Sequence, residues 1–255
     1  EHNFPVLLVG QTGVGKSVIV QSLCNELVET DKFASITVNY SAQTSPKNLV
    51  TVFEAKLEQK RKNLLGAPVG KRMLMFVDDL NMPAQEKFFA QPCNELLRQV
   101  MTESLSSNIK GGGYYDTKKL FWKSIQDVVI MSACAPPGGG RKDVSARLTR
   151  LFNMIWLTDL SAQSMKTIFS SILQGFLSFE APELKHLARS LTTASVDIYL
   201  QARSALLPTP KKSHYTFNLR DLSKVFQGML MVQNKQIPNQ DALLKLWCHE
   251  QRRVI

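Results

Sequence analysis

Apolar residues in the first part of the chain form short runs that alternate with longer amphipathic stretches. Short apolar runs predict buried strands, and segments with helical periodicity predict helices. We expect strands at 4–10, 36–40, 73–78, 128–134 and 154–157, and helices at 15–29, 86–103 and 143–152, with a further helix beginning at the capping Ser45 and Pro46 within 45–62. Strands that alternate with helices are typical of an α/β fold with a parallel sheet covered on both faces.

The pattern changes near residue 159, after which only helical segments follow. We expect helices at 161–178, 183–203, 218–235 and 239–253, and a loop at 206–216. Residues 106–125 interrupt the first region, and their glycines, aromatics and alternating positions predict a β-hairpin insert. The pattern therefore predicts a domain at 1–158 and a helical domain at 159–255.

Composition narrows the class of protein. The chain of 255 residues has a net charge of +10, but its basic residues are dispersed and no basic run is interleaved with aromatics. The charge thus indicates a solvated face or a face that meets neighbouring protein, and no nucleic-acid partner is expected. No apolar run is long enough for a membrane span, and no secretory signal stands at the start, so no membrane association is expected. Cys24, Cys93, Cys134 and Cys248 are widely spaced, and three of them lie in apolar-periodic stretches, which indicates buried, reduced thiols of an intracellular protein.

The run GQTGVGKS lies between the first predicted strand and the first predicted helix. It matches G-x-x-x-x-G-K-[ST], in which backbone N–H groups and the helix start surround a phosphate. Lys16 is placed to reach the β- and γ-phosphates, and the Ser17 hydroxyl is placed to bind Mg²⁺. We expect ATP or ADP to contact Gly10, Gln11, Thr12, Gly13, Val14, Gly15, Lys16, Ser17 and Val18.

Two carboxylates end the apolar run MLMFVDD. Asp78 is the expected metal carboxylate, directly or through water. Asp79 has two possible roles: it is a candidate general base that orients the attacking water, or a turn or helix-capping residue.

Three arginines are candidates for contact with the γ-phosphate. Arg220 lies near the start of a helix in the second domain, where it either senses the nucleotide or forms a surface ion pair. Arg147 and Arg150 are three residues apart and share a helical face. They are either an arginine finger that reaches a neighbouring subunit's site or part of a solvated face.

The runs GQTGVGKS, FVDDLNMP, APPGGGR, HYTFNLRDLSKVFQG and LWCHEQRRV together resemble an AAA+ module of a dynein heavy chain. The residue sequences of the segments SAQTS, DDLNMP and APPGGGR are most similar to the third module of axonemal dyneins. The resemblance covers essentially the whole chain.

This resemblance implies a P-loop AAA+ module with a five-stranded parallel-sheet large subdomain and a helical small subdomain. It implies Lys16 and Ser17 as Walker A residues, Asp78 as the Walker B aspartate, Arg220 as the sensor-two arginine, and Arg147 or Arg150, of which Arg150 is preferred, as the finger for the adjacent module. The implied partners are neighbouring modules of the same heavy chain, other dynein chains, and microtubules only through parts outside this sequence. The implied location is the cytoplasm and the axonemal cytoskeleton of a cilium or flagellum.

Two positions depart from the general AAA+ pattern. The usual Walker B glutamate is Asp79, and the polar sensor-one position before the Pro-Pro pair is Ala135. Both departures favour slow, regulatory hydrolysis. The chain also looks like one module excised from a larger ring, and we expect it to be a monomer. The alternatives are a structural ring segment that holds nucleotide without turnover, and a nucleic-acid-translocating enzyme, which no motif supports.

Overall fold

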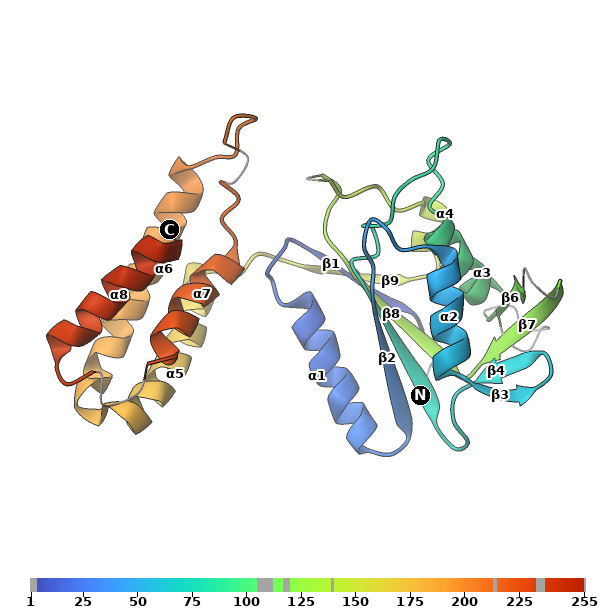
Figure 1. Cartoon of the computed structure of the whole chain (residues 1–255), viewed down its shortest axis with the longest axis horizontal. Helices are drawn as coiled ribbons and strands as arrows, with labels where there is room; N and C mark the ends of the chain where they lie inside the picture. The colour runs from blue at the N-terminus through green and yellow to red at the C-terminus, as the bar shows by residue number, and fades with distance from the viewer. Residues whose placement is uncertain are drawn as a thin grey trace. The chain divides into compact units, whose positions relative to one another are not determined.

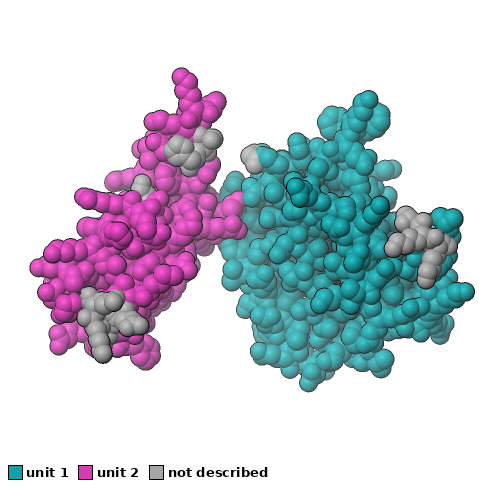
Figure 2. Space-filling model, in the orientation of Figure 1, with its two compact units in different colours: residues 1–11, 15–158 teal, residues 12–14, 159–255 magenta. Residues whose placement is uncertain are grey.

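The computed structural model describes residues 4–104, 112–116, 120–138, 140–212, 215–232 and 237–254, and Figure 1 traces the chain. The chain divides into two compact units, one with residues 1–11 and 15–158 and the other with residues 12–14 and 159–255 (Figure 2). Each unit buries an apolar core of its own. No described helix is long and apolar enough to cross a membrane.

A five-stranded parallel sheet forms the centre of the first unit, as predicted. Its strands, in spatial order, are β2 (Phe33–Asn39), β5 (Arg72–Asp78), β8 (Val128–Cys134), β1 (Val6–Gly10) and β9 (Asn153–Leu157). All four neighbouring pairs are parallel. The carboxyl ends of β1, β5 and β8 therefore lie along one edge of the sheet.

Helices cover both faces of this sheet (Figure 1). On one face, α1 (Lys16–Glu29) packs Val20 and Cys24 against Leu74 and Phe76 of β5. On the other face lie α2 (Pro46–Lys56), α3 (Pro92–Ser104) and α4 (Ala146–Thr149), with a core that includes Met75 of β5. Because successive side chains of a strand point to opposite faces, one apolar run supplies both cores.

The second predicted helix begins where expected but ends earlier. The Ser45 hydroxyl accepts a hydrogen bond from the backbone N–H of Asn48 at 3.3 Å, so the predicted cap is confirmed. The helix ends at Lys56, because Leu57 has extended backbone angles and stays buried. The polar residues that follow form β3 (Glu58–Arg61), which pairs with β4 (Leu64–Gly66); tertiary pairing here overrides a helix-compatible sequence.

Two other helices are shorter than predicted. α3 begins at Pro92 rather than at residue 86, since proline is compatible with a first helical turn but not with a helix interior. α4 contains only Ala146–Thr149 instead of 143–152. Leu148 in α4 and Phe152 after it are buried, so packing fixes this short segment.

The predicted hairpin insert is confirmed in its described part. β6 (Gly113–Asp116) and β7 (Phe121–Gln126) pair antiparallel, while residues 105–111 and 117–119 lie outside the described ranges. β7 also pairs with β4, which makes a second sheet in the order β3-β4-β7-β6. The hairpin therefore joins a small sheet that no local pattern indicated.

The second unit is helical in its described residues after 158, as the sequence predicts. Its helices are α5 (Ala162–Glu180), η1 (Pro182–Leu187), α6 (Ala188–Ala205), α7 (Leu219–Leu230) and α8 (Gln240–Val254). The predicted 183–203 helix is a 3₁₀ segment followed by α6, and residues 233–236, in the predicted 218–235 helix, lie outside the described ranges. Phe169 and Phe226 stack at a centroid distance of 4.6 Å and join α5 to α7.

Candidate functional site

The loop between β1 and α1 carries the predicted phosphate-binding run. β1 ends at Gly10 and α1 begins at Lys16, so the motif occupies the strand-to-helix position that phosphate binding requires. Gly13 and Gly15 have φ values of 92° and 90°, a region that side chains with a Cβ disfavour. The glycines therefore allow the turn that directs the loop's backbone toward one centre.

Lys16 is the buried cation of this loop, with only 8% of its surface exposed. Its Nζ donates hydrogen bonds to the carbonyl oxygens of Gly10 and Gln11, both at 2.8 Å. Burial lowers the pKa of Lys16 from its ordinary value, whereas the carboxylates of Asp79 and Asp78 act to raise it. The ammonium is thus held inside the loop, close to both acidic residues.

Ser17 and Asp78 meet although they come from different elements. The Ser17 hydroxyl, in the first turn of α1, donates a hydrogen bond to Asp78 Oδ2 at the end of β5. One hydroxyl and one carboxylate in contact are oxygen ligands of the kind that Mg²⁺ prefers, together with phosphate oxygens and water. The two predicted metal residues are therefore brought together.

Asp79 follows in a left-handed backbone conformation with φ of 54°. Its backbone N–H donates to Asp78 Oδ1 at 3.0 Å, and its carbonyl accepts from the N–H of Met82 at 2.9 Å. The turn interpretation is thus correct, but the helix-cap interpretation is wrong, because the next helix begins only at Pro92. The Asp79 carboxylate accepts no hydrogen bond from the described residues and stays available for other chemistry.

Asn81 is a residue that the sequence reasoning did not single out. It is 1% exposed, and its Nδ2 donates to the carbonyl oxygen of Ala135 at 2.7 Å. Its own carbonyl accepts from the N–H of Lys142 at 3.1 Å. Asn81 thereby ties the turn after β5 to the loop after β8. The only available signal was the polar residue within DDLNMP, which reads equally as a turn.

Cys134 ends β8 beside this cluster. Burial raises the pKa of the Cys134 thiol to about 11, while the positive charges of Lys16 and Arg141 act to lower it. Cys24 and Cys93 are buried as well, so the predicted burial of three thiols is confirmed, whereas Cys248 is exposed; all four are free. Cys134 therefore lies within electrostatic reach of the phosphate-loop lysine.

The two candidate finger residues lie at the ends of α4 and are exposed. The backbone N–H of Arg147 donates to the Ser145 hydroxyl at 3.3 Å, and Arg150 is the residue that ends the helix. Neither guanidinium pairs with a carboxylate among the described residues. Both guanidinium groups are thus available to bind an anion that does not belong to this chain.

Arg220 lies in the second unit, in the first turn of α7. Asn218 and Asp221 form a capping box there, and the backbone N–H of Arg220 donates to Asn218 Oδ1 at 2.8 Å. The Arg220 side chain is exposed. It forms no ion pair with a carboxylate among the described residues, so the surface ion pair considered as an alternative is not present there. Its contact with the nucleotide stays a prediction.

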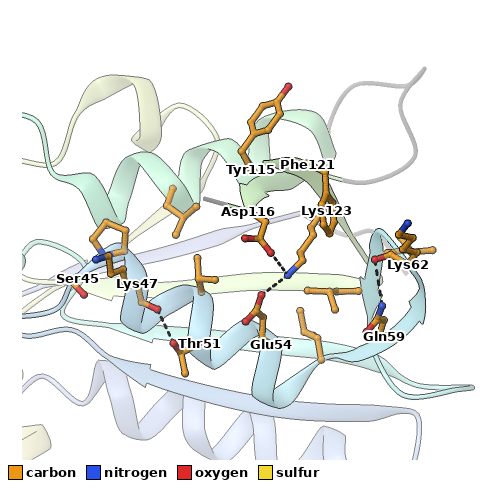
Figure 3. A pocket seen from close by; sticks show the side chains of 16 residues that line it. Ser45, Lys47, Thr51, Glu54, Gln59, Lys62, Tyr115, Asp116, Phe121 and Lys123 are labelled. Atoms are coloured by element: carbon orange, nitrogen blue, oxygen red, sulfur yellow. Dashed lines mark hydrogen bonds and ion pairs between the residues drawn. The ribbon is translucent and has the colours of Figure 1, made fainter. Parts of the chain in front are cut away.

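A separate groove lies between α2 and the small sheet, with a volume of about 1240 Å³ (Figure 3). Lys123 of β7 points between two carboxylates, Glu54 of α2 and Asp116 of β6, and the Asp116 ion pair measures 2.7 Å. Burial acts to lower the pKa of Lys123, but the hydrogen bonds that its ammonium donates to Asp116 and Glu54 outweigh this effect and raise the pKa. None of the predicted nucleotide-site residues lines this groove.

The parallel sheet, the glycine loop and the Ser17–Asp78 contact are the features of a P-loop AAA+ module, and a helical second unit follows it. Comparison with protein-family models places residues 1–160 in the P-loop containing dynein motor region and residues 168–255 in the dynein heavy chain ATPase lid domain. The chain belongs to the family of dynein motor regions.

Curated relatives agree with this assignment. The chain is 51% identical over 249 residues to human dynein axonemal heavy chain 6 and 41% identical over 263 residues to human dynein axonemal heavy chain 1. It is also 41% identical over 249 residues to the dynein-1-beta heavy chain of the flagellar inner arm I1 complex from Chlamydomonas reinhardtii. Each alignment covers 98% of this chain but only 5–6% of the relative's length.

Proposed function

We propose that this chain is an ATP-binding AAA+ module of an axonemal dynein heavy chain, with slow, regulatory hydrolysis. The observation that carries the proposal is the convergence of Lys16, Ser17 and Asp78 at the end of the phosphate loop. Lys16 would neutralise the β- and γ-phosphates, and Ser17 and Asp78 would hold Mg²⁺. The residue sequences of the segments DDLNMP and APPGGGR support the assignment of this chain to the third module of the heavy chain.

The proposed catalytic parts are Asp79, Lys16 and Arg220. Asp79 would orient the attacking water as the general base, with an aspartate in place of the usual glutamate. Ala135 offers that water no side-chain hydrogen bond, which supports slow turnover. The same observation favours a second candidate function, a ring segment that holds nucleotide without hydrolysing it.

The proposed partners are neighbouring modules of the same heavy chain and other dynein chains, in the axoneme of a cilium or flagellum. Exposed apolar side chains on the edge strand β9, namely Met154, Ile155 and Trp156, support a protein neighbour. Contact with microtubules would come only through parts of a heavy chain outside this sequence. Arg147 and Arg150 are proposed to serve a neighbour's site rather than their own.

Thermal unfolding with and without Mg-ATP or Mg-ADP tests nucleotide binding. At a hundredfold excess over Kd, binding stabilises the folded state by about 2.7 kcal/mol, which corresponds to a rise in Tm of roughly 5–10 °C. Lys16→Ala should abolish this rise, and Lys32→Ala, which removes an exposed lysine, should keep it. An unchanged Tm of the unmodified chain, with no nucleotide retained through purification, would reject the proposal.

A further inference from the structure

Arg141 is the last residue of the run APPGGGR, in the loop between β8 and α4, and the proposed function assigns its side chain no role. Its Nε is buried and has no hydrogen-bond partner among the described residues. No described carboxylate forms an ion pair with its guanidinium either. A buried, charged donor without an acceptor costs free energy, so an acceptor from outside the protein would complete this site.

The backbone around Arg141 is fixed to the acidic turn. Gly138 and Arg141 form an isolated β-bridge, in which each N–H donates to the other's carbonyl oxygen at 3.2 and 3.1 Å. Asn81 accepts from the next residue, Lys142, and donates to Ala135 at the start of the same loop. The loop that carries Arg141 is therefore held against the turn that contains Asp79.

The charges near Arg141 point to an anion. Burial is the main reason for the lowered pKa of Lys16, and the positive charge of Arg141 lowers it further. The same charge opposes the rise in the pKa of Cys134. The guanidinium thus lies within electrostatic reach of both the phosphate-loop lysine and the carboxyl end of β8. Two neighbouring cations at a phosphate loop favour a ligand with several negative charges.

We propose that Arg141 is a further binding residue of this site and donates from its guanidinium to the terminal phosphate of ATP in the same chain. The proposal rests on the proposed function. Asn81 holds the loop of Arg141 against the turn that contains Asp79, near the ends of β5 and β8, where the γ-phosphate and the attacking water would lie. A planar guanidinium matches phosphate oxygens well, and it would supply the side-chain donor that Ala135 lacks.

Titration calorimetry with the Mg²⁺ complexes of AMPPNP, a non-hydrolysable ATP analogue, and of ADP tests this role. Arg141→Gln should weaken binding of the analogue on the order of 10–100-fold, the range for loss of a charged hydrogen bond. It should weaken ADP binding less than about threefold, because ADP lacks the phosphate concerned. Lys142→Gln removes the same charge from an exposed neighbour and should leave both affinities unchanged.

The outcomes separate this inference from the proposed function. Binding of neither nucleotide by the unmodified chain would reject the nucleotide site itself. If the unmodified chain binds both nucleotides and Arg141→Gln binds them with the same affinities as the unmodified chain, only the role of Arg141 is overturned. Equal losses for the analogue and for ADP would overturn the assignment to the terminal phosphate. If circular dichroism shows that Arg141→Gln does not fold, Arg141→Met, which keeps the apolar stem, is measured in the same way.

Discussion

The Ser17 hydroxyl donates a hydrogen bond to the Asp78 carboxylate, 61 residues further along the chain. Ser17 lies in the first turn of α1, and Asp78 ends β5, which is separated from β1 by β8 in the sheet. The contact therefore requires β5 and β1 to be joined through β8, with α1 packed on the face of the sheet. It also holds the Asp78 carboxylate, whose other oxygen accepts from the N–H of Asp79 at 3.0 Å. The proposed metal ligands and the candidate base thus lie at one hydrogen-bonded turn.

Asp79 is expected to control hydrolysis but not binding. Asp79→Asn should lower the single-turnover rate by about 10²-fold or more, since general bases contribute on that scale. Asp79→Glu should raise the rate, because a misplacement of about 1 Å in the shorter side chain can cost on the order of 100-fold. Rapid-quench measurement of bound ATP conversion checks both rates.

The Asp79 variants have a direct control in affinity. Calorimetry with Mg-ADP should give the same Kd for Asp79→Asn as for the unmodified chain, because ADP binding needs no base. A hydrolysis rate that does not change in Asp79→Asn would exclude Asp79 as the base. The unmodified chain by itself should not hydrolyse several ATP molecules per second, because such a rate is expected only of a site with all its catalytic groups. A rate of that order would exclude the slow regulatory role.

Arg147 and Arg150 are expected not to act on the nucleotide of their own chain. Both are exposed at the ends of α4, and a double alanine variant should leave the affinity for Mg-ATP within about twofold. Calorimetry on the isolated chain measures this. A large loss of affinity in a folded, monomeric double variant would show that one of them binds in cis.

Cys134 is expected to make stability depend on alkaline pH. Its folded pKa of about 11 lies above the ordinary value of 9.0, so the folded state keeps the proton longer than the unfolded state. Its contribution is fully present below pH 9 and is lost as pH rises toward 11. The urea midpoint should therefore fall more over this window in the unmodified chain than in Cys134→Ala; equal falls would contradict the shift.

The same burial predicts selective thiol labelling. At neutral pH, an aromatic disulfide reagent should modify the exposed Cys248 quickly, while Cys24, Cys93 and Cys134 react only on unfolding. Absorbance should report one fast thiol and three slow ones. Fast reaction of two or more thiols in the folded chain would contradict the burial of these three cysteines.

Lys123 is expected to stabilise the small sheet (Figure 3). Lys123→Met removes the cation that pairs with both Glu54 and Asp116, of which the Asp116 side chain is only 10% exposed, and should lower the unfolding free energy by about 2 kcal/mol. Adding Asp116→Asn should recover part of the loss. Lys62→Met replaces an exposed lysine of the same groove and should change the unfolding free energy by less than about 0.5 kcal/mol. A similar loss in both single variants would exclude a specific role for the pair.

The sequence by itself determined the parallel sheet, the glycine-rich loop, and Ser17 and Asp78 as the proposed metal ligands. Strand periodicity, the glycines before Lys16 and the acidic end of MLMFVDD are local features, and local chemistry fixes their roles in the fold. The capping Ser45 and the start of α2 at Pro46 were likewise predictable, because a cap depends only on neighbouring backbone groups.

Only the tertiary structure decided which distant groups lie together. It ended α2 at Lys56, placed Leu57 in the core and paired β3 with β4, because packing and strand pairing outweigh helix propensity. It also joined Asn81 to Ala135 and left the buried Nε of Arg141, near the phosphate loop, without an acceptor among the described residues. Such relations depend on contacts between segments far apart in the chain, which no local pattern of residues encodes.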